Sequence, residues 1–312
     1  MSRSGTVALL GRPNAGKSTL INLLLHNKVA IVSDKPQTTR HRIAGVLTEP
    51  RGQIVLFDLP GVHRPLHRMN VQMMHVLRDT LAEVDVVLHL FDVTQPVGGG
   101  GDRFVLDLVH KIEVPVVLVA TKVDIEAVRD AIEERIGHFR GRHDYAAAVL
   151  TSAVTGEGCQ ELIDLIFPLL PEQELLIDPG LSTTQSERFF IAELIREAVL
   201  GEVEEELPFT TAVDLRHMEE EETPQGPLLR LWADIVVERE SQKGIIVGRG
   251  GRTVRQIGTT ARAQIERLLG ARVYLDLLVK ARPGWREDAR FLADLQPIEA
   301  PFDAGTGGST DE

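Results

Sequence analysis

We predict an α/β fold, in which a domain with a mostly parallel sheet is followed by a smaller α+β domain. The first observation behind this prediction is that apolar, β-branched runs alternate with segments of helical periodicity, which is typical of a parallel sheet covered by helices on both faces. The second is a glycine-rich loop that directly follows the first apolar run. The third is an α-β-β-α-α-β order of elements beyond residue 186.

The expected elements follow one another along the whole chain. In the first domain we expect strands at 7–10, 54–57, 84–91, 114–120 and 146–150, and helices at 69–82, 103–111, 125–139 and 159–169. In the second we expect a helix at 186–200, strands at 210–217 and 228–238, helices at 241–247 and 253–269, and a strand at 272–280. Prolines and a glycine between them indicate a linker. The predicted division is therefore a first domain at 5–170, a linker at 171–185, a second domain at 186–295 and a disordered tail at 296–312.

Composition restricts the class of protein. With 312 residues, 43% apolar and 26% charged, the chain is long enough for two folded domains. The single cysteine excludes an intramolecular disulfide and suits a reducing cytosol. No apolar run reaches the ~18 residues of a spanning helix, and residues 1–5 lack the apolar core of a signal peptide. We therefore expect a soluble, cytoplasmic protein, and no long heptad seam demands more than a monomer.

A phosphate-binding loop is the strongest motif of the chain. The loop lies between the strand expected at 7–10 and a helical segment, and its residues are Gly11, Arg12, Pro13, Asn14, Ala15, Gly16, Lys17, Ser18 and Thr19. Backbone N–H groups of such a loop turn inward on a diphosphate, Lys17 can reach the β- and γ-phosphates, and the Ser18 hydroxyl can bind Mg²⁺. The motif predicts a site for a nucleoside triphosphate.

Three further segments complete a nucleotide site at the carboxyl ends of the strands. Asp58 ends the strand at 54–57 and can bind Mg²⁺ through water, while the amide of Gly61 can sense a γ-phosphate. Thr121, Lys122 and Asp124 end the strand at 114–120, and Asp124 can accept from N1–H and the 2-amino group of guanine, which selects GTP over ATP. Ser152 and Ala153 end the next strand. The set resembles the translation-factor-like GTPases, whose usual third motif is Asn-Lys-x-Asp, and Thr121 in place of that asparagine is expected to loosen the tether to the phosphate loop.

The loop at 33–42 is the expected γ-phosphate sensor. It offers Thr38 and Thr39, and its run from Gln37 to Arg42 resembles the second motif of the Era GTPase family. We favour Thr39 as the Mg²⁺ ligand, alongside Ser18 and Asp58. Lys17, Thr39 and Gly61 are the expected catalytic residues.

The residue after Gly61 is Val62, where Ras-like enzymes carry the glutamine that orients the attacking water. Catalysis must therefore use another group. The resemblance implies a slow enzyme assisted by a K⁺ ion on Asn14, and an ordinary loop-stabilising hydrogen bond by Asn14 is the alternative. We expect His63 and His67 to be solvated rather than catalytic.

The second domain carries a local basic charge. The net charge of the chain is −12, but the segment 241–295 holds more Lys and Arg than Asp and Glu. A G-x-x-G turn lies within it, and glycines there let a nucleic-acid backbone approach the loop amides. The expected RNA-binding residues are Lys243, Ile246, Val247, Gly248, Arg249, Gly250, Gly251, Arg252, Val254 and Arg255, with Ile257 also shaping the groove.

The element order and this turn resemble a type II KH domain. A GTPase domain followed by such a domain resembles the Era family over about residues 5–295. This resemblance implies a GTP/GDP switch with Mg²⁺ that binds the 3′ region of small-subunit ribosomal RNA and assists assembly of the small subunit. It also implies a cytoplasmic location with peripheral contact to the inner face of the cell membrane. The alternative is a GTP-controlled protein-binding or membrane-docking switch whose second domain is an interaction module.

Overall fold

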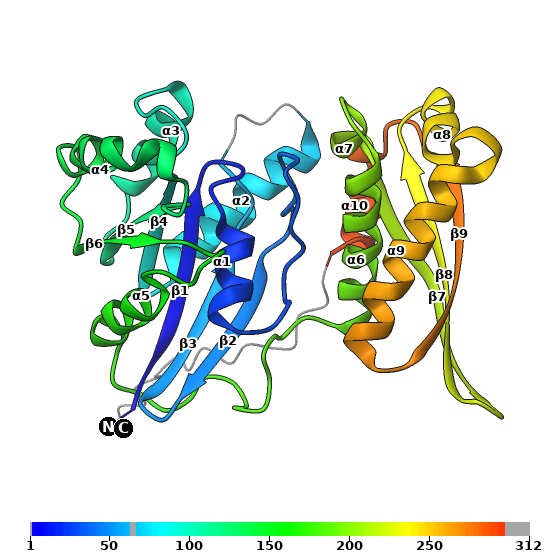
Figure 1. The fold of residues 1–312 in the computed structure, drawn as a ribbon, viewed down its shortest axis with the longest axis horizontal. Helices are drawn as coiled ribbons and strands as arrows, with labels where there is room; N and C mark the ends of the chain where they lie inside the picture. The colour runs from blue at the N-terminus through cyan, green and yellow to red at the C-terminus, as the bar shows by residue number, and fades with distance from the viewer. Residues whose placement is uncertain (1, 63–66, 297–312) are drawn as a thin grey trace, which may run out of the picture.

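The first domain is built on a six-stranded sheet. The computed structural model describes residues 2–62 and 67–296, and its two domains lie side by side (Figure 1). The strands are β1 (Arg3–Gly11), β2 (Ile43–Glu49), β3 (Gly52–Asp58), β4 (Val86–Asp92), β5 (Val116–Thr121) and β6 (Ala147–Thr151), in the order β2-β3-β1-β4-β5-β6. Every neighbouring pair is parallel except β2 with β3. The five predicted strands and the mostly parallel sheet are therefore confirmed.

Strand β2 is the element of this sheet that the sequence analysis missed. It is antiparallel to β3 and lies at the edge of the sheet. The βαβ alternation that reveals parallel strands does not apply to it, because a tight connection joins β2 directly to β3.

Helices cover both faces of the sheet. They are α1 (Lys17–Leu24), α2 (Arg68–Glu83), α3 (Gly100–Val109), α4 (Ile132–Arg140) and α5 (Cys159–Ile166), with 3₁₀ turns at Glu126–Ala131 and Phe167–Leu169. Helices α1 and α5 share one apolar cluster with β1 residues Val7 and Leu9. Helices α2 and α3 share another with Ala8 and Leu10. Because neighbouring residues of β1 point to opposite faces, these clusters lie on opposite sides of the sheet.

The second domain packs two long helices on one face of a three-stranded sheet. Its elements are α6 (Glu187–Glu202), α7 (Leu207–Thr210), β7 (Ala212–Thr223), β8 (Gly226–Val237), α8 (Glu240–Val247), α9 (Arg252–Leu269), β9 (Arg272–Ala281) and α10 (Ala289–Asp294), with 3₁₀ turns at Arg249–Gly251 and Trp285–Glu287. Strand β8 is antiparallel to β7 and parallel to β9. The predicted α-β-β-α-α-β order is confirmed. Helix α7, the 3₁₀ turn at Trp285–Glu287 and helix α10 were not predicted.

The segment predicted as a linker is bonded along the first domain. Gln53, which is fully buried, accepts from the amides of Leu176 and Ile177 and donates to the Ile177 carbonyl. Thr183 forms a bridge with Gly45 of β2. The chain therefore leaves the first domain only near Ser186, whose hydroxyl caps α6 by accepting from the Phe189 amide. The predicted disordered tail lies, except for Gln296, outside the described residues.

Candidate nucleotide site and nucleic-acid interface

The phosphate-binding loop connects β1 to α1. Asn14 and Gly16 have positive φ angles of 62° and 83°, which turn the loop so that the first amides of α1 open toward solvent. Lys17 is only 6% exposed, and its ammonium donates to the Arg12 carbonyl. Burial lowers the pKa of Lys17, and the Coulomb attraction of Asp58 opposes this shift. The charge of Asp58 therefore offsets only part of the desolvation of the Lys17 ammonium. A negatively charged phosphate would stabilise this ammonium further.

Three side chains from three separate segments meet beside Lys17. The Ser18 hydroxyl of α1 lies 2.5 Å from Asp58 Oδ2 at the end of β3 and 3.0 Å from Thr39 Oγ1. Thr39 also donates to the same carboxylate oxygen, at 3.1 Å. Thr38 points elsewhere, because its hydroxyl donates to the Lys35 carbonyl at 2.6 Å. The geometry therefore brings Thr39, and not Thr38, to Ser18 and Asp58.

This cluster suits a hard divalent cation. Asp58 is fully buried, and its Oδ1 has no hydrogen-bond partner among the described residues. Burial raises the pKa of Asp58, although Lys17, Ser18 and Thr39 oppose the shift. Across the described residues no three His, Cys, Asp or Glu side chains gather into a metal-binding cluster. Two hydroxyls beside one carboxylate are the donor set in which Mg²⁺ is held together with nucleotide phosphates.

A cavity of 310 Å³ opens in front of the loop. The predicted residues that line it are Pro13, Asn14, Gly16, Lys17, Ser18, Thr19, Thr39, Gly61 and Lys122. Thr38, the other candidate of the loop at 33–42, also lines it, together with residues on or beside that loop that the sequence analysis did not single out: Val32, Ser33, Asp34 and Gln37. The size and the polar lining fit a phosphate chain.

Three residues of the predicted loop do not line this cavity. Gly11 is buried at the end of β1, and its carbonyl accepts from the Val62 amide. Arg12 pairs with Asp102 of α3 at 3.4 Å. Arg12 and Ala15 line a separate cavity on the other side of the loop. The side chains of Arg12 and Ala15 shape the loop, and the predicted contacts of Gly11, Arg12 and Ala15 with the nucleotide, through backbone amides, stay a prediction.

Asn14 forms a loop-stabilising hydrogen bond, which is one of the two roles that the sequence analysis gave it. Its amide donates to the Asp34 carbonyl at 2.6 Å and so joins the phosphate-binding loop to the loop at 33–42. This contact does not exclude K⁺ coordination by the same side chain, which stays a prediction.

Of the two histidines after Gly61, the structure describes only His67. His67 is partly exposed and does not line the cavity, in keeping with the expectation that it is not catalytic. His63 lies outside the described residues.

A neighbouring pocket of 180 Å³ lies where the guanine base is expected. Asp124, Thr121 and Ala153 line it together with the apolar side chains of Leu20 and Val154. Thr121 donates to the Ala15 carbonyl at 2.9 Å and to the Phe91 carbonyl at 3.1 Å. The shorter hydroxyl therefore still reaches the phosphate-binding loop, and the expectation that this tether is looser than that of an asparagine stays a prediction.

Of the two remaining predicted residues, Lys122 lines this pocket and Ser152 does not. Lys122 pairs with Asp92 at 2.6 Å, with a positive φ of 64°. Ser152 is fully buried and its hydroxyl accepts from the amides of Val154 and Thr155. Its side chain thus orders the loop after β6 and does not line the pocket.

The G-x-x-G turn joins α8 to α9 as predicted. Gly248, Gly250 and Gly251 all have positive φ angles, and the arginines at 249, 252 and 255 are exposed. Ile246 and Ile257 are fully buried in the core of the second domain. The predicted RNA contact of Ile246 and the predicted place of Ile257 in the groove are wrong, because the amphipathic period of α8 and α9 turns these two side chains inward. Val247 and Val254 are partly exposed beside the turn.

A groove of 390 Å³ runs from the turn along α9 and β9. The predicted residues in it are Gly251, Val254 and Arg255. Five further residues line it that the sequence analysis missed: Gly258, Thr259, Arg262, Leu275 and Leu277. The spacing of Arg255, Gly258, Thr259 and Arg262 places them on one helix face, and this pattern could have revealed them.

The loop at 33–42 also touches the second domain. Arg40 is buried and donates to the carbonyls of Thr211 and Pro208 at 2.8 and 2.7 Å. Arg196 of α6 donates to the Thr38 carbonyl and pairs with Glu193 at 2.6 Å. Burial alone would raise the pKa of Glu193, but Arg196 outweighs it and the pKa is lowered. The segment that carries Thr39 is thus fixed on both sides by the second domain.

Comparisons with known proteins agree with both halves of the chain. Residues 6–122 match the family model described as "50S ribosome-binding GTPase", and residues 229–286 match the KH domain model. Among the described residues no helix combines the length and apolarity needed to cross a membrane.

Relatives and solved structures extend this match to nearly the whole chain. GTPase Era of Heliobacterium modesticaldum is 42% identical over 91% of this chain and 94% of its own, and that of Geobacter metallireducens is 42% identical over 94% and 97%. A crystal structure of Era with MgGDPNP and nucleotides 1506–1542 of 16S ribosomal RNA matches with a TM-score of 0.89 at 32% identity, covering 95% of this chain and 99% of that one. A point variant of Aquifex aeolicus Era bound to GDP·AlF4⁻ matches with a TM-score of 0.88 at 32% identity, covering 94% and 98%. With the nucleotide site and the KH domain in one chain, these matches show that the protein belongs to the Era GTPase family.

Proposed function

We propose that this protein is a GTP-hydrolysing switch that binds single-stranded RNA of the 3′ region of small-subunit ribosomal RNA and assists assembly of the small ribosomal subunit. The observation that carries the proposal is the meeting of Ser18, Thr39 and Asp58 in one domain, with an open basic groove beside a G-x-x-G turn in the other. The 32% identical Era bound to MgGDPNP and 16S ribosomal RNA supports both ligands.

In this proposal each group of the nucleotide site has a separate task. Lys17 neutralises charge on the β- and γ-phosphates, and the amide of Gly61 donates to the γ-phosphate. Ser18, Thr39 and Asp58 hold Mg²⁺, which when bound supplies positive charge to the phosphate oxygens. Val62 is buried and apolar, so the attacking water is oriented by another group. Asn14 with a K⁺ ion remains our candidate for added positive charge.

The loop at 33–42 is proposed to couple the two ligands. Thr39 faces the nucleotide cavity, while the next residue, Arg40, is bonded to the second domain. Loss of the γ-phosphate would release Thr39 and thereby loosen the hold of Arg40 on the turn at 208–211. The second domain would then face its RNA differently.

The test is binding to a short single-stranded RNA from the 3′ end of small-subunit ribosomal RNA, measured with a GTP analogue, with GDP and without nucleotide. We expect binding that strengthens with the GTP analogue. Equal affinity with analogue and GDP at saturation would remove the coupling. No binding in any state would leave a GTPase whose second domain has another partner, which is the alternative of a protein-binding or membrane-docking switch.

A pair of variants at Gly248 separates these alternatives. A Cβ at this position would lie 2.2 Å from the Thr253 hydroxyl, and φ is +71°, so any side chain strains the turn. Gly248→Ala therefore reports the strain, and Gly248→Asp adds a carboxylate where a phosphate is expected. If the groove binds RNA, the aspartate variant should lose clearly more affinity than the alanine variant, and both should keep GTPase activity.

A monomer in the cytoplasm, with peripheral contact to the inner face of the cell membrane, is part of the same proposal. Sedimentation of the protein with anionic vesicles, in the GTP-analogue and GDP states, tests the membrane contact.

A further inference from the structure

Helix α2 begins without a cap of its own. Its side chains Met69 and Met73 line a cavity together with Arg40 and His41 of the loop at 33–42, so the position of its first turns bears on that loop. In the described part of the chain, His67 at the N-cap position makes no side-chain capping bond, and no acidic residue lies in the first turn. An uncapped helix start leaves amide N–H groups without partners and carries a partial positive charge.

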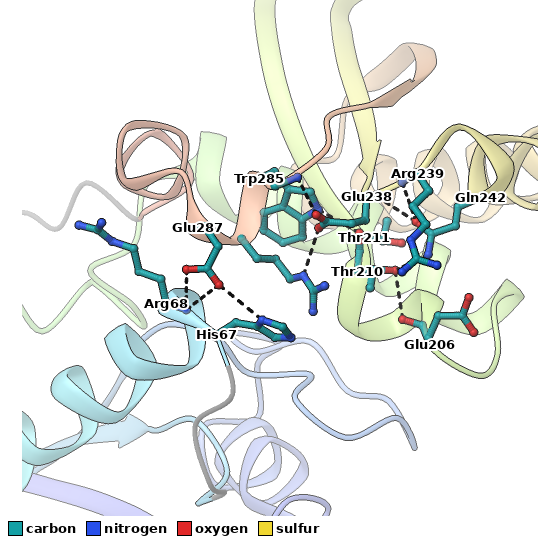
Figure 2. Close-up of polar contacts among 12 residues, drawn as sticks. His67, Arg68, Glu206, Thr210, Thr211, Glu238, Arg239, Gln242, Trp285 and Glu287 are labelled. Atoms are coloured by element: carbon teal, nitrogen blue, oxygen red, sulfur yellow. Dashed lines mark hydrogen bonds and ion pairs between the residues drawn. The ribbon is translucent and has the colours of Figure 1, made fainter.

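The second domain supplies the missing acceptor. Both carboxylate oxygens of Glu287 lie 3.3 Å from the amide nitrogen of Arg68, the first residue of α2. Glu287 Oε1 also lies 3.4 Å from Nδ1 of His67. Figure 2 shows the carboxylate pointing at the start of α2 from the turn that follows β9. The geometry is that of an N-cap supplied by a residue 219 positions away in sequence.

The turn that carries Glu287 is held in place. Glu238, at the end of β8, accepts from the Gly284 amide at 2.6 Å and from Arg286 Nε at 3.2 Å. Trp285 is fully buried and its indole N–H donates to the Thr210 carbonyl at 3.1 Å (Figure 2). A carboxylate on a fixed turn loses little entropy when it caps a helix.

Apolar packing holds α2 against the same turn. Met69 and Met73, on the first two turns of α2, form one buried cluster with Trp285 and Phe291. Arg40 of the loop at 33–42 lies over the Trp285 ring, with its Cζ 5.9 Å from the ring centroid. The turn at 284–287 therefore contacts both the first turns of α2 and the loop at 33–42.

We propose that Glu287 is a positioning residue for GTP hydrolysis: from the second domain it caps the start of α2 and so fixes this helix beside Arg40 and His41 of the loop that carries Thr39. It touches neither nucleotide nor metal in this role. The proposal rests on the GTPase activity of the family and is independent of the RNA partner, because its test needs no RNA.

The test compares Glu287→Ala with the full-length wild type, and Glu222→Ala at the tip of the β7–β8 hairpin is the matched control. We expect amide exchange in the first turn of α2 to become about five-fold faster, as for the loss of one cap. We expect kcat for GTP to fall about two- to five-fold with KM unchanged, because the phosphate-binding loop is untouched and only positioning is lost. The control should behave as wild type.

A rescue distinguishes capping from simple tethering. His67→Asp places a capping side chain at the N-cap position itself. In the Glu287→Ala background it should restore slow exchange and most of kcat, whereas added to wild type it should weaken the domain contact by placing two carboxylates together. Failure of the rescue with intact folding would overturn the capping role. The proposal as a whole would be overturned if Glu287→Ala showed the same amide exchange and the same kcat as the Glu222→Ala control. It would also be overturned if Glu287→Ala exchanged faster but kept the wild-type kcat.

Discussion

The nucleotide site and the groove beside the G-x-x-G turn, which we propose as the RNA groove, both depend on glycines, but for different physical reasons. A Cβ on Gly61 would lie 2.8 Å from the Cα of Pro13, so packing within the protein requires a glycine there. At Gly250 and Gly251 a Cβ would meet nothing within 4 Å. Those positions need a glycine for their positive φ angles and for the close approach of a ligand.

The charged groups of the two sites differ in the same way. Lys17 and Asp58 are buried, and their pKa values are shifted by desolvation. The arginines of the RNA groove, such as Arg255 and Arg262, are exposed. The comparison indicates that the nucleotide site is preorganised at a cost in desolvation, whereas the groove attracts its ligand through screened charges in water.

The largest effect is expected at Lys17. Lys17→Ala removes a buried cation from a low-dielectric site, so kcat/KM for GTP should fall by at least about 100-fold. Steady-state phosphate release measures it, with Lys111→Ala at the exposed end of α3 as the control. A loss of only a few-fold would contradict a preorganised site.

A smaller effect is expected from the two neighbouring threonines, which provide a matched pair. Thr39→Ala should reduce the preference for a GTP analogue over GDP by about ten-fold, because one hydroxyl ligand of Mg²⁺ is lost. Thr38→Ala removes only the bond to the Lys35 carbonyl and should leave the preference near wild type. Titration calorimetry with both nucleotides checks this, and equal losses in the two variants would contradict the assignment of Thr39.

The pH dependence sharpens the comparison of buried with exposed charges. A raised pKa means that Asp58 holds its proton up to a higher pH than an ordinary carboxyl group, so protons compete with Mg²⁺ as the pH falls. Mg²⁺ affinity should therefore weaken by a few-fold between about pH 8 and about pH 5. Guanidinium groups in general do not titrate in that range, so RNA affinity should change less. Fluorescence titrations at fixed ionic strength would measure both, and a Mg²⁺ affinity independent of pH would contradict the prediction.

The smallest effect is expected in the groove. Arg262→Gln should weaken RNA binding about two- to three-fold and lower the slope of log affinity against log salt by about 0.7, as for one phosphate contact to a single strand. GTPase activity should stay unchanged. An unaltered salt slope would show that Arg262 does not contact a phosphate.

Local patterns account for most of what could be predicted. The order of strands and helices follows from hydrophobic periodicity, and the phosphate-binding loop, Asp58 and the G-x-x-G turn follow from short motifs whose neighbours in sequence are also neighbours in space. The same reasoning failed for Ile246 and Ile257, because it placed them near the turn without asking which face of each helix is buried.

The sequence by itself determined the fold class, the nucleotide class and the position of the G-x-x-G turn, because each follows from periodicity or from short motifs of residues close together in the chain. Only the tertiary structure decided that Thr121 still reaches the phosphate-binding loop, that Arg40 bonds to the turn before β7, and that Glu287 caps α2. These contacts join residues 106, 171 and 219 positions apart. No periodicity or motif records such distances, since Thr121 and Ala15 meet only when the first domain is folded, and the other two pairs meet only when both domains are folded and packed against each other.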